Sequence, residues 1–322
     1  MQTRTLGYTG EQLTTVGLGA WAIGGPWLYG WGPQDDGDSV DTILEAMEAG
    51  INWIDTAPIY GHGRSEKIVG ATLKQLSKKP FIATKCALTW DAVNERIPCL
   101  KAQSIREECF QSLKRLDIDV IDLYQIHFSQ PDEDIEEGWE EVARLKEQGL
   151  VRHIGVSNFN VEQLKRIHKI HPPASLQPPY SMINRGIEED LLEYCGQNNI
   201  GVICYSPMQR GLLTGKFTAE RVTSLPPGDH RKTNDQFQEP QFSATLELVE
   251  GLKEIAERTG HTSAQLSVSW TLRRGELTAA IVGARRKGQI AETAKASDYQ
   301  LTEAELEEIE QLLKLRQEKI NG

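Results

Sequence analysis

Four side chains that together could protonate an oxygen atom stand at or just after the ends of three short apolar runs. Asp55 ends the first run, and Tyr60 follows it in a turn rich in Pro and Gly. Lys85 ends the second run and His127 the third. Singly, these residues are ordinary, because Asp begins many turns and a lone Lys or His is usually a surface or packing residue. In a parallel barrel, however, the C-terminal strand ends meet at one rim, so we expect the four to converge.

The chemistry that these groups suit is the protonation of a carbonyl that is being reduced. A tyrosine hydroxyl has an ordinary pKa of about 10, and a nearby ammonium such as Lys85 would lower it. Asp55 would hold Lys85 charged and in place, while His127 would orient the substrate oxygen or help relay its proton. Because no side chain supplies hydride, the reaction also requires a cofactor that does.

The elements that must position these residues alternate between strand and helix patterns along the chain. Continuous apolar strands with intervening helices predict an α/β fold, a (β/α)8 TIM barrel, formed by one domain over residues 1–322. The predicted strands cover residues 16–21, 51–54, 81–85, 120–126, 151–156, 175–177, 201–205 and 278–282. The predicted helices include residues 39–49, 65–74, 104–116 and 135–148.

Two segments outside the repeat flank the barrel. Residues 3–15 form a predicted hairpin that could plug the barrel bottom. Residues 301–315 form a predicted extra amphipathic helix, which begins with a capping box from Thr302 to Glu305.

Three loops after strands are expected to shape a pocket: residues 24–37, 88–98 and 218–240. Trp27 and Trp31 in the first loop suit a pocket wall as well as a packing role. The third loop is polar and longer than an ordinary connection, which predicts a lid or a partly mobile segment.

Composition narrows the choice of partners. The net charge of −11 disfavours nucleic acid or an anionic membrane, either of which would need a basic face. The chain has no apolar stretch of about 18 residues and no basic-then-apolar start, so we expect a cytoplasmic protein. Five scattered cysteines without a C-x-x-C pair argue against a disulfide framework or a zinc site.

The expected partner is a small carbonyl or alcohol substrate, and the expected state is a monomer or weak homo-oligomer.

Along nearly its whole length the chain resembles the aldo-keto reductases, including the potassium-channel β-subunit branch. The motifs that carry the resemblance are G-L-G-A-W at 17–21, D-T-A-P-I-Y-G at 55–61, A-T-K at 83–85, D-L-Y-Q-I-H at 122–127, I-G-V-S-N-F at 154–159, Y-S-P-M-x-R-G-L-L-T-G-K at 205–216 and G-A-R-R-K-x-Q-I-x-E at 283–292.

The resemblance implies a nicotinamide-dependent aldehyde or ketone reductase, reversible in direction. Tyr60 would be the general acid, Lys85 would lower its pKa, Asp55 would pair with Lys85, and His127 would position the carbonyl. The further residues that the resemblance places at the cofactor are Ala20, Trp21, Asp55, Ser157, Asn158, Gln177, Tyr205, Ser206, Pro207, Met208, Arg210, Gly211, Lys216, Gly283, Arg285, Gln289, Glu292 and Thr293.

Within that set the resemblance assigns particular parts of the cofactor. Ser157, Asn158 and Gln177 would meet the carboxamide, the Tyr205 ring would stack on the nicotinamide, and residues 206–216 would wrap the pyrophosphate. Ser157 to Phe159 also suit a helix N-cap, and both roles are compatible.

A basic cluster suggests which dinucleotide is bound. Arg285, Arg286 and Lys287 follow the last strand and precede a predicted helix, where donors and helix dipole favour an anion. In the family this is the place of the 2'-phosphate, so the resemblance favours NADPH/NADP over NADH. The family commonly has Glu-Asn at the adenine contact, where this chain has Glu292-Thr293.

Two other functions compete with a reductase. The potassium-channel β subunits suggest an NADPH-binding regulatory or redox-sensing subunit with low turnover. A metal-dependent hydrolase would use Asp55, His62 and His127. No His-x-His or His-x-x-x-His pair occurs at a strand end, and Lys85 would place a positive charge beside the metal, so we expect no metal.

Overall fold

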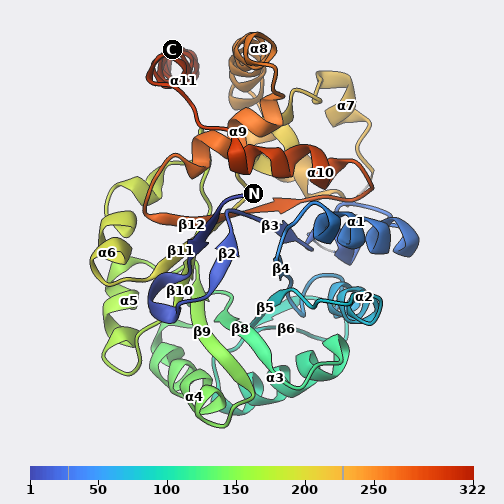
Figure 1. Cartoon of the computed structure of the whole chain (residues 1–322), viewed down its shortest axis with the longest axis vertical. Helices are drawn as coiled ribbons and strands as arrows, with labels where there is room; N and C mark the ends of the chain where they lie inside the picture. Colours follow the sequence, from blue (N-terminus) through green and yellow to red (C-terminus); the bar gives the residue numbers. More distant parts are fainter. Residues whose placement is uncertain (28, 227) are drawn as a thin grey trace.

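Eight parallel strands close into a barrel in the computed structural model, which describes residues 1–27, 29–226 and 228–322. Around the barrel the strands run β3, β4, β5, β8, β9, β10, β11 and β12, and β12 pairs back onto β3. A ring of helices surrounds them (Figure 1). The strands are β3 (Val16–Gly19), β4 (Trp53–Asp55), β5 (Phe81–Cys86), β8 (Ile121–Ile126), β9 (Val151–Ser157), β10 (Ser175–Gln177), β11 (Gly201–Tyr205) and β12 (Leu277–Gly283). The predicted TIM barrel is confirmed.

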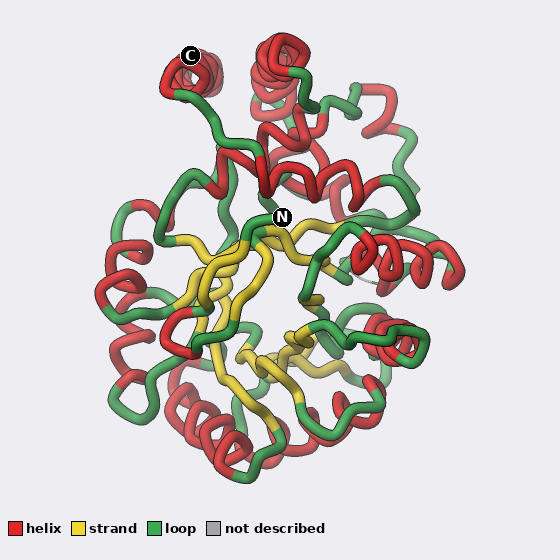
Figure 2. Tube along the Cα trace, in the orientation of Figure 1, coloured by secondary structure: helices red, strands yellow, loops and turns green. Residues whose placement is uncertain are grey.

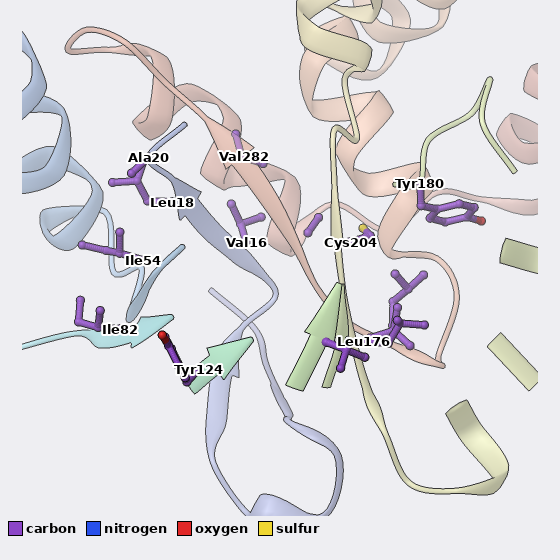
Figure 3. Close-up of a cluster of buried hydrophobic side chains, with 14 of the residues drawn as sticks. Val16, Leu18, Ala20, Ile54, Ile82, Tyr124, Leu176, Tyr180, Cys204 and Val282 are labelled. Carbon is purple, nitrogen blue, oxygen red and sulfur yellow. The ribbon is translucent and has the colours of Figure 1, made fainter. Parts of the chain in front are cut away.

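The strands are apolar throughout because both of their faces are buried. On the outward face, side chains such as Val16, Leu18, Ile54 and Ile82 have no exposed surface or nearly none and belong to the main hydrophobic core. Figure 3 shows part of this core. The inward face fills the barrel itself and carries the site described below.

The helices that cover the barrel follow the expected alternation. They are α1 (Asp36–Glu48), α2 (Arg64–Leu73), α3 (Ala102–Leu116), α4 (Ile135–Glu147), α5 (Val161–His168), α6 (Leu191–Gln197), α7 (Ala219–Thr223), α8 (Gln241–Thr259), α9 (Ser263–Leu272), α10 (Gln289–Ala294) and α11 (Glu303–Asn321). On α3, Ile105 and Cys109 are buried, whereas Phe110 is half exposed. None of the described helices is long and apolar enough to cross a bilayer.

The extra C-terminal helix begins where the sequence predicts it. Thr302 accepts a hydrogen bond from the Glu305 amide, and the Glu305 side chain accepts one from the Thr302 amide, which completes the capping box. The helix, α11, packs against α8 outside the barrel's ring of helices (Figure 2).

The predicted N-terminal hairpin consists of β1 (Thr3–Thr5) and β2 (Gln12–Thr14), and it closes the barrel bottom. Leu6 and Leu13 from the hairpin pack with inward-facing Trp53 and other barrel side chains. The Trp53 indole N–H donates to the Thr14 carbonyl over 2.8 Å, so the hairpin satisfies this buried donor. The hairpin lies across the barrel opening in Figure 1.

Two of the three predicted pocket loops contain structure of their own. Residues 88–98 form a small antiparallel hairpin of β6 (Leu88–Trp90) and β7 (Arg96–Pro98). The segment 218–240 carries α7 and two short 3-10 helices. Leu225 and Phe237 of this segment join an apolar cluster with Leu212, Phe217 and Phe242, which connects it to the segment after β11 and to α8.

Candidate active site

The four predicted catalytic residues, Asp55, Tyr60, Lys85 and His127, do converge at the C-terminal rim of the barrel. Asp55 is the last residue of β4, Lys85 lies near the end of β5, and His127 directly follows β8. Tyr60 comes from the turn after β4, and its ring packs edge-on against His127 at 5.9 Å between centroids. Because these strands are neighbours in the barrel, their ends bring the side chains together as predicted.

A buried ion pair forms the base of this group. Lys85 Nζ lies 2.7 and 2.8 Å from the two carboxylate oxygens of Asp55, and also donates to the Thr56 carbonyl at 3.0 Å. The side chain of Lys85 has no exposed surface. The Tyr60 hydroxyl lies 3.3 Å from the same ammonium nitrogen. A buried charge is stable only with such complete pairing, so the geometry of the whole group is tightly constrained.

The electrostatics of Tyr60 differ from the sequence prediction. Burial, together with the charge of Asp55, raises the pKa of Tyr60 well above its ordinary value, where we predicted that Lys85 would lower it. Two causes explain the difference: the ammonium lies closer to both Asp55 oxygens than to the phenol, and the phenol is buried. Burial likewise lowers the pKa of Lys85.

His127 is held as a neutral imidazole. Burial first, and then the positive charges of Lys85 and Arg96, lower the pKa of His127 well below its ordinary value. Its Nδ1 is buried and has no hydrogen-bond partner among the described residues. A neutral ring can donate a hydrogen bond to a substrate oxygen without carrying a charge into the cavity.

Tyr60, His127 and Asp55 line a cavity of about 720 Å³, whereas Lys85 lies behind it and acts on it only through its neighbours. With one exception, all of the predicted cofactor residues line this cavity. The exception is Ala20, which is buried; its amide donates to the Asp55 carbonyl and its carbonyl accepts from Ser65. We therefore correct the placement of Ala20: it supports the cavity wall and does not face the cavity.

Polar side chains from three strands meet beside Asp55. Gln177 Nε2 donates to Asp55 Oδ2 at 2.8 Å, and Ser157 Oγ donates to the Gln177 carbonyl. Asn158 donates to the His127 carbonyl and accepts from the Tyr205 hydroxyl at 2.8 Å. The N-cap of α5 lies one residue after the segment 157–159 suggested for it. Asn160 caps the helix in a capping box with Gln163.

The segment after β11 has a backbone suited to anion binding. Ser206, Gln209, Arg210 and Gly211 have positive φ values of 58°, 46°, 55° and 92°. Left-handed residues in such a turn direct successive N–H groups toward one side, and they persist at functional sites despite their strain. Arg210 lines the cavity, and its Nε is buried without a partner among the described residues. The donors available here fit a phosphate group.

Arginines gather at the far end of the cavity from two different segments. Arg285 and Arg286 were predicted, and Arg221 and Arg231 from the segment 218–240 were not. Burial first, and then the nearby charges of Arg231 and Arg286, lower the pKa of both Arg221 and Arg285, so the four lie close together. Arg231 is paired with Asp229 at 2.6 Å, and the cluster holds more arginines than the sequence motif alone indicated.

Aromatic rings connect the two long loops above the cavity. His230 lies 4.8 Å from both Trp21 and Trp31 between ring centroids, and its Nδ1 and the Gly30 carbonyl are 3.0 Å apart. The pocket-wall role considered for Trp27 and Trp31 holds, because both rings line the cavity. Sequence reasoning missed His230, which no local motif marks.

The residues required for a metal centre do not meet. His62 packs between Trp27 and Trp90 and does not line the cavity that holds Asp55 and His127. Among residues 1–27, 29–226 and 228–322, no group of three or more His, Cys, Asp or Glu side chains could hold a metal ion.

Comparison with known proteins agrees with this geometry. The Aldo/keto reductase family model matches residues 15–314. The chain is 38% identical to "Aldo-keto reductase YhdN" of Bacillus subtilis over 97% of its own length and 94% of the relative's. It is 35% identical to the "NADH-specific methylglyoxal reductase" of Escherichia coli, over 93% of this chain and 94% of that protein.

Two solved structures are similar over nearly the whole chain. The glycerol dehydrogenase AKR11B4 from Gluconobacter oxydans superimposes with a TM-score of 0.88 at 36% identity, covering 97% of this chain and 95% of that one. The aldo-keto reductase AKR11C1 from Bacillus halodurans, in its holo form, gives 0.80 at 26% identity, covering 97% and 96%. The barrel and its rim residues agree with the family model and with these relatives. This chain therefore belongs to the aldo/keto reductase family.

Proposed function

We propose that this protein reduces small aldehydes and ketones to alcohols, reversibly, with NADPH as the hydride source and Tyr60 as the proton donor. One observation carries the proposal: the Tyr60 hydroxyl lies 3.3 Å from the buried Lys85 ammonium, beside neutral His127, in the wall of a large cavity. An acid, a neutral hydrogen-bond donor and a fixed charge directed at one point suit the protonation of a carbonyl oxygen.

Each residue of the site has a separate role in carbonyl reduction. When bound, the nicotinamide cofactor supplies the hydride that reduces the carbonyl carbon. His127 orients the carbonyl oxygen, and the Tyr60 hydroxyl donates its proton to that oxygen. The tyrosinate left behind is stabilised by Lys85, which Asp55 keeps charged, and it regains a proton from solvent. In alcohol oxidation the same groups act in reverse.

The cofactor would be held along the length of the cavity. Asn158 and Gln177 already form hydrogen bonds that fix their amides beside Asp55, where they suit the carboxamide. Tyr205, whose hydroxyl is fixed by Asn158, suits the nicotinamide face. The unpartnered Arg210 Nε and the left-handed turn around it suit the pyrophosphate.

The preference for NADPH rests on the arginines at the far end, of which Arg231 is already paired with Asp229 at 2.6 Å. Arg285 is already committed, because its side chain donates to Gln34 Oε1 at 3.0 Å and to the Pro33 carbonyl. The Arg286 side chain has no hydrogen bond or ion pair to any residue described, so we assign it the 2'-phosphate, with Arg221 nearby. The E. coli relative is named as NADH-specific, so a direct test of this preference is needed.

Replacing Arg286 by Ala tests the cofactor assignment. We expect the Kd for NADPH to rise by about 10-fold or more while the Kd for NADH is unchanged, because a charge-assisted hydrogen bond to phosphate contributes roughly 1.5–3 kcal/mol and is weakened by solvent at this site. Lys287→Ala is the matched control, since Lys287 is exposed and does not line the cavity. Equal weakening of both dinucleotides would contradict the assignment.

Turnover with simple aldehydes tests the enzyme assignment separately. We expect steady consumption of NADPH with butanal and its loss in Tyr60→Phe. Tight NADPH binding without turnover of any aldehyde, ketone or polyol would instead favour the regulatory or redox-sensing subunit.

A further inference from the structure

One cationic side chain stands at the substrate end of the cavity, away from the arginine cluster at the cofactor end. The walls here are apolar and aromatic, with Trp27, Tyr29, Leu88 and Phe128 among them. Arg96 lines the same region. It belongs to β7 of the small hairpin that follows the strand carrying Lys85. This hairpin thus brings a positive charge to a pocket wall that is otherwise suited to carbon chains.

Arg96 is held by aromatic faces and by no counter-charge. Its guanidinium lies 5.1 Å from the Tyr29 ring centroid and 5.5 Å from that of Phe128. It has no hydrogen bond or ion pair with any of the described side chains. The hairpin turn carries two acids, Asp91 and Glu95, and neither forms an ion pair with Arg96; Asp91 accepts hydrogen bonds from the amides of Val93 and Glu95. Stacking on ring faces leaves the N–H edges of a guanidinium free for a planar anion.

The carboxylates that line the cavity are placed elsewhere. Asp55 is neutralised by Lys85 at 2.7 Å. Asp35 caps α1 and Asp38 lies in its first turn, beside the Gln34 that binds Arg285 at the cofactor end. Glu292, also at the cofactor end, lies 3.6 Å from Lys216 Nζ. Arg96 is therefore the only charge among the described residues of the substrate end that is available to a ligand. Its field reaches the rim group, because its charge is among the causes that lower the pKa of His127.

The path from Arg96 to the reacting atoms runs along one ring. Phe128 stacks on His127 with centroids 5.1 Å apart and planes 15° apart, and the Arg96 guanidinium lies 5.5 Å from the Phe128 centroid. His127 in turn faces Tyr60. A carbonyl held by Tyr60 and His127 would extend its remaining atoms along Phe128 and end beside the guanidinium.

We propose that this site takes carbonyl substrates that carry an anionic group, a carboxylate first of all, a short carbon chain away from the carbonyl. This assignment rests on the proposed reductase function and adds a substrate class to it. Arg96 binds the anionic end by paired N–H donors, the aromatic walls cover the chain, and Tyr60 with His127 receive the carbonyl. The reaction is otherwise unchanged: hydride adds to the carbonyl carbon and the Tyr60 proton to its oxygen.

The test compares matched substrates in the whole enzyme with NADPH present. We expect kcat/KM for 4-oxobutanoate to exceed that for butanal and for methyl 4-oxobutanoate, which has the same chain without the charge. In Arg96→Met, KM for 4-oxobutanoate should rise by about 10-fold or more with kcat little changed, while both neutral aldehydes change less than about 3-fold. Higher ionic strength should weaken only the charged substrate.

Three controls separate the possible failures. Arg96→Lys keeps the charge without the planar fork and should recover part of the effect. Arg152→Met removes one charge at the opposite end of the barrel and should leave every substrate unaffected. An aldehyde bearing a phosphate, 2-oxoethyl phosphate, distinguishes a preference for carboxylate from one for any anion.

Two results would overturn the assignment to Arg96 while leaving the reductase function intact. One is a wild-type enzyme that reduces butanal as well as 4-oxobutanoate. The other is an Arg96→Met enzyme that loses charged and neutral substrates equally. Absence of turnover with all of these aldehydes, with NADPH still bound, would instead count against the proposed function itself.

Discussion

The two ends of the barrel interior are built by the same strands and have opposite chemistry. On β4, Trp53 faces inward at the bottom and Asp55 faces inward at the rim; on β5, Ala83 and Lys85 have the same relationship. Residues two apart on a strand point to the same side, so each of these two strands contributes one inward-facing residue to the bottom and one to the rim. The bottom is an apolar cluster closed by the hairpin. The rim holds a buried ion pair and polar atoms that have no partner in the part of the chain that the structure describes.

The bottom of the barrel contributes to stability, whereas the rim sacrifices some stability to hold the charged groups that the chemistry requires. Burying Trp53, Leu6 and Leu13 removes apolar surface from water and fills the barrel without charge. Burying Lys85 and Asp55 costs desolvation that their short contacts offset only in part. The rim geometry therefore depends on a well-packed bottom that does not have to move.

Removing the Tyr60 hydroxyl should give the largest effect, and it should affect only the rim's chemistry. Tyr60→Phe is expected to lower kcat/KM for carbonyl reduction by about 100- to 10,000-fold, the usual contribution of general acid catalysis. NADPH binding and the unfolding midpoint should stay unchanged, because the ring remains. Tyr205→Phe, which removes a phenol hydroxyl from the same cavity, should lose far less. Similar losses in both variants would remove Tyr60 from its assigned role.

Breaking the ion pair should affect chemistry and stability together. Lys85→Met leaves the Asp55 carboxylate buried without its cation, which typically costs about 3–5 kcal/mol in unfolding free energy. Denaturant unfolding measures this loss. Adding Asp55→Asn should restore part of the stability while activity stays low. A double variant no more stable than Lys85→Met alone would show that the buried carboxylate is not the cause.

A cavity at the bottom should affect stability alone. Trp53→Ala is expected to lower the free energy of unfolding by about 3–5 kcal/mol through lost burial and an unfilled cavity. The surviving folded enzyme should keep most of its kcat. Gly17 offers a matched partner, because a Cβ there would lie 2.0 Å from Trp53 Cε2. Gly17→Ala should destabilise the wild type and be tolerated once Trp53 is Ala; additive losses would place the contact elsewhere.

The smallest effect is expected in the pH profile for reduction, which we predict to be flat. Since burial raises the pKa of Tyr60, its proton stays in place, and kcat/KM for reduction should be level from about pH 6 to about pH 9. The lowered pKa of His127 removes any step near its ordinary value. Oxidation, which needs the phenolate, should rise over the same range. A reductive limb that falls below pH 9 would mean that Lys85 outweighs burial once cofactor is bound.

Sequence reasoning located the strand ends well because hydrophobic runs and barrel closure fix them. All eight strands and the convergence of Asp55, Tyr60, Lys85 and His127 follow from that pattern. Several helices received no predicted bounds; among them, α9 is buried on all sides and has no polar face to give it a period.

The contributions of the segment 218–240 could not be predicted in the same way. Arg221, His230 and Arg231 reach the cavity through contacts with distant parts of the chain, such as Gly30 and Trp31, that no local pattern encodes. The direction of the Tyr60 pKa likewise required distances, since sequence shows an ammonium nearby but not how fully Asp55 engages it.

The hairpin that closes the barrel bottom also bears on how the chain folds during synthesis. Arg4 donates to the carbonyls of Leu272, Arg274 and Leu277, and the Gln2 amide donates to Ser297. Strand β3 likewise finds one of its two partners in β12. Residues that leave the ribosome early therefore have partners that are made more than 250 residues later. At typical elongation rates of about 5–20 residues per second, the nascent barrel must wait many seconds, open at one seam, before it can close.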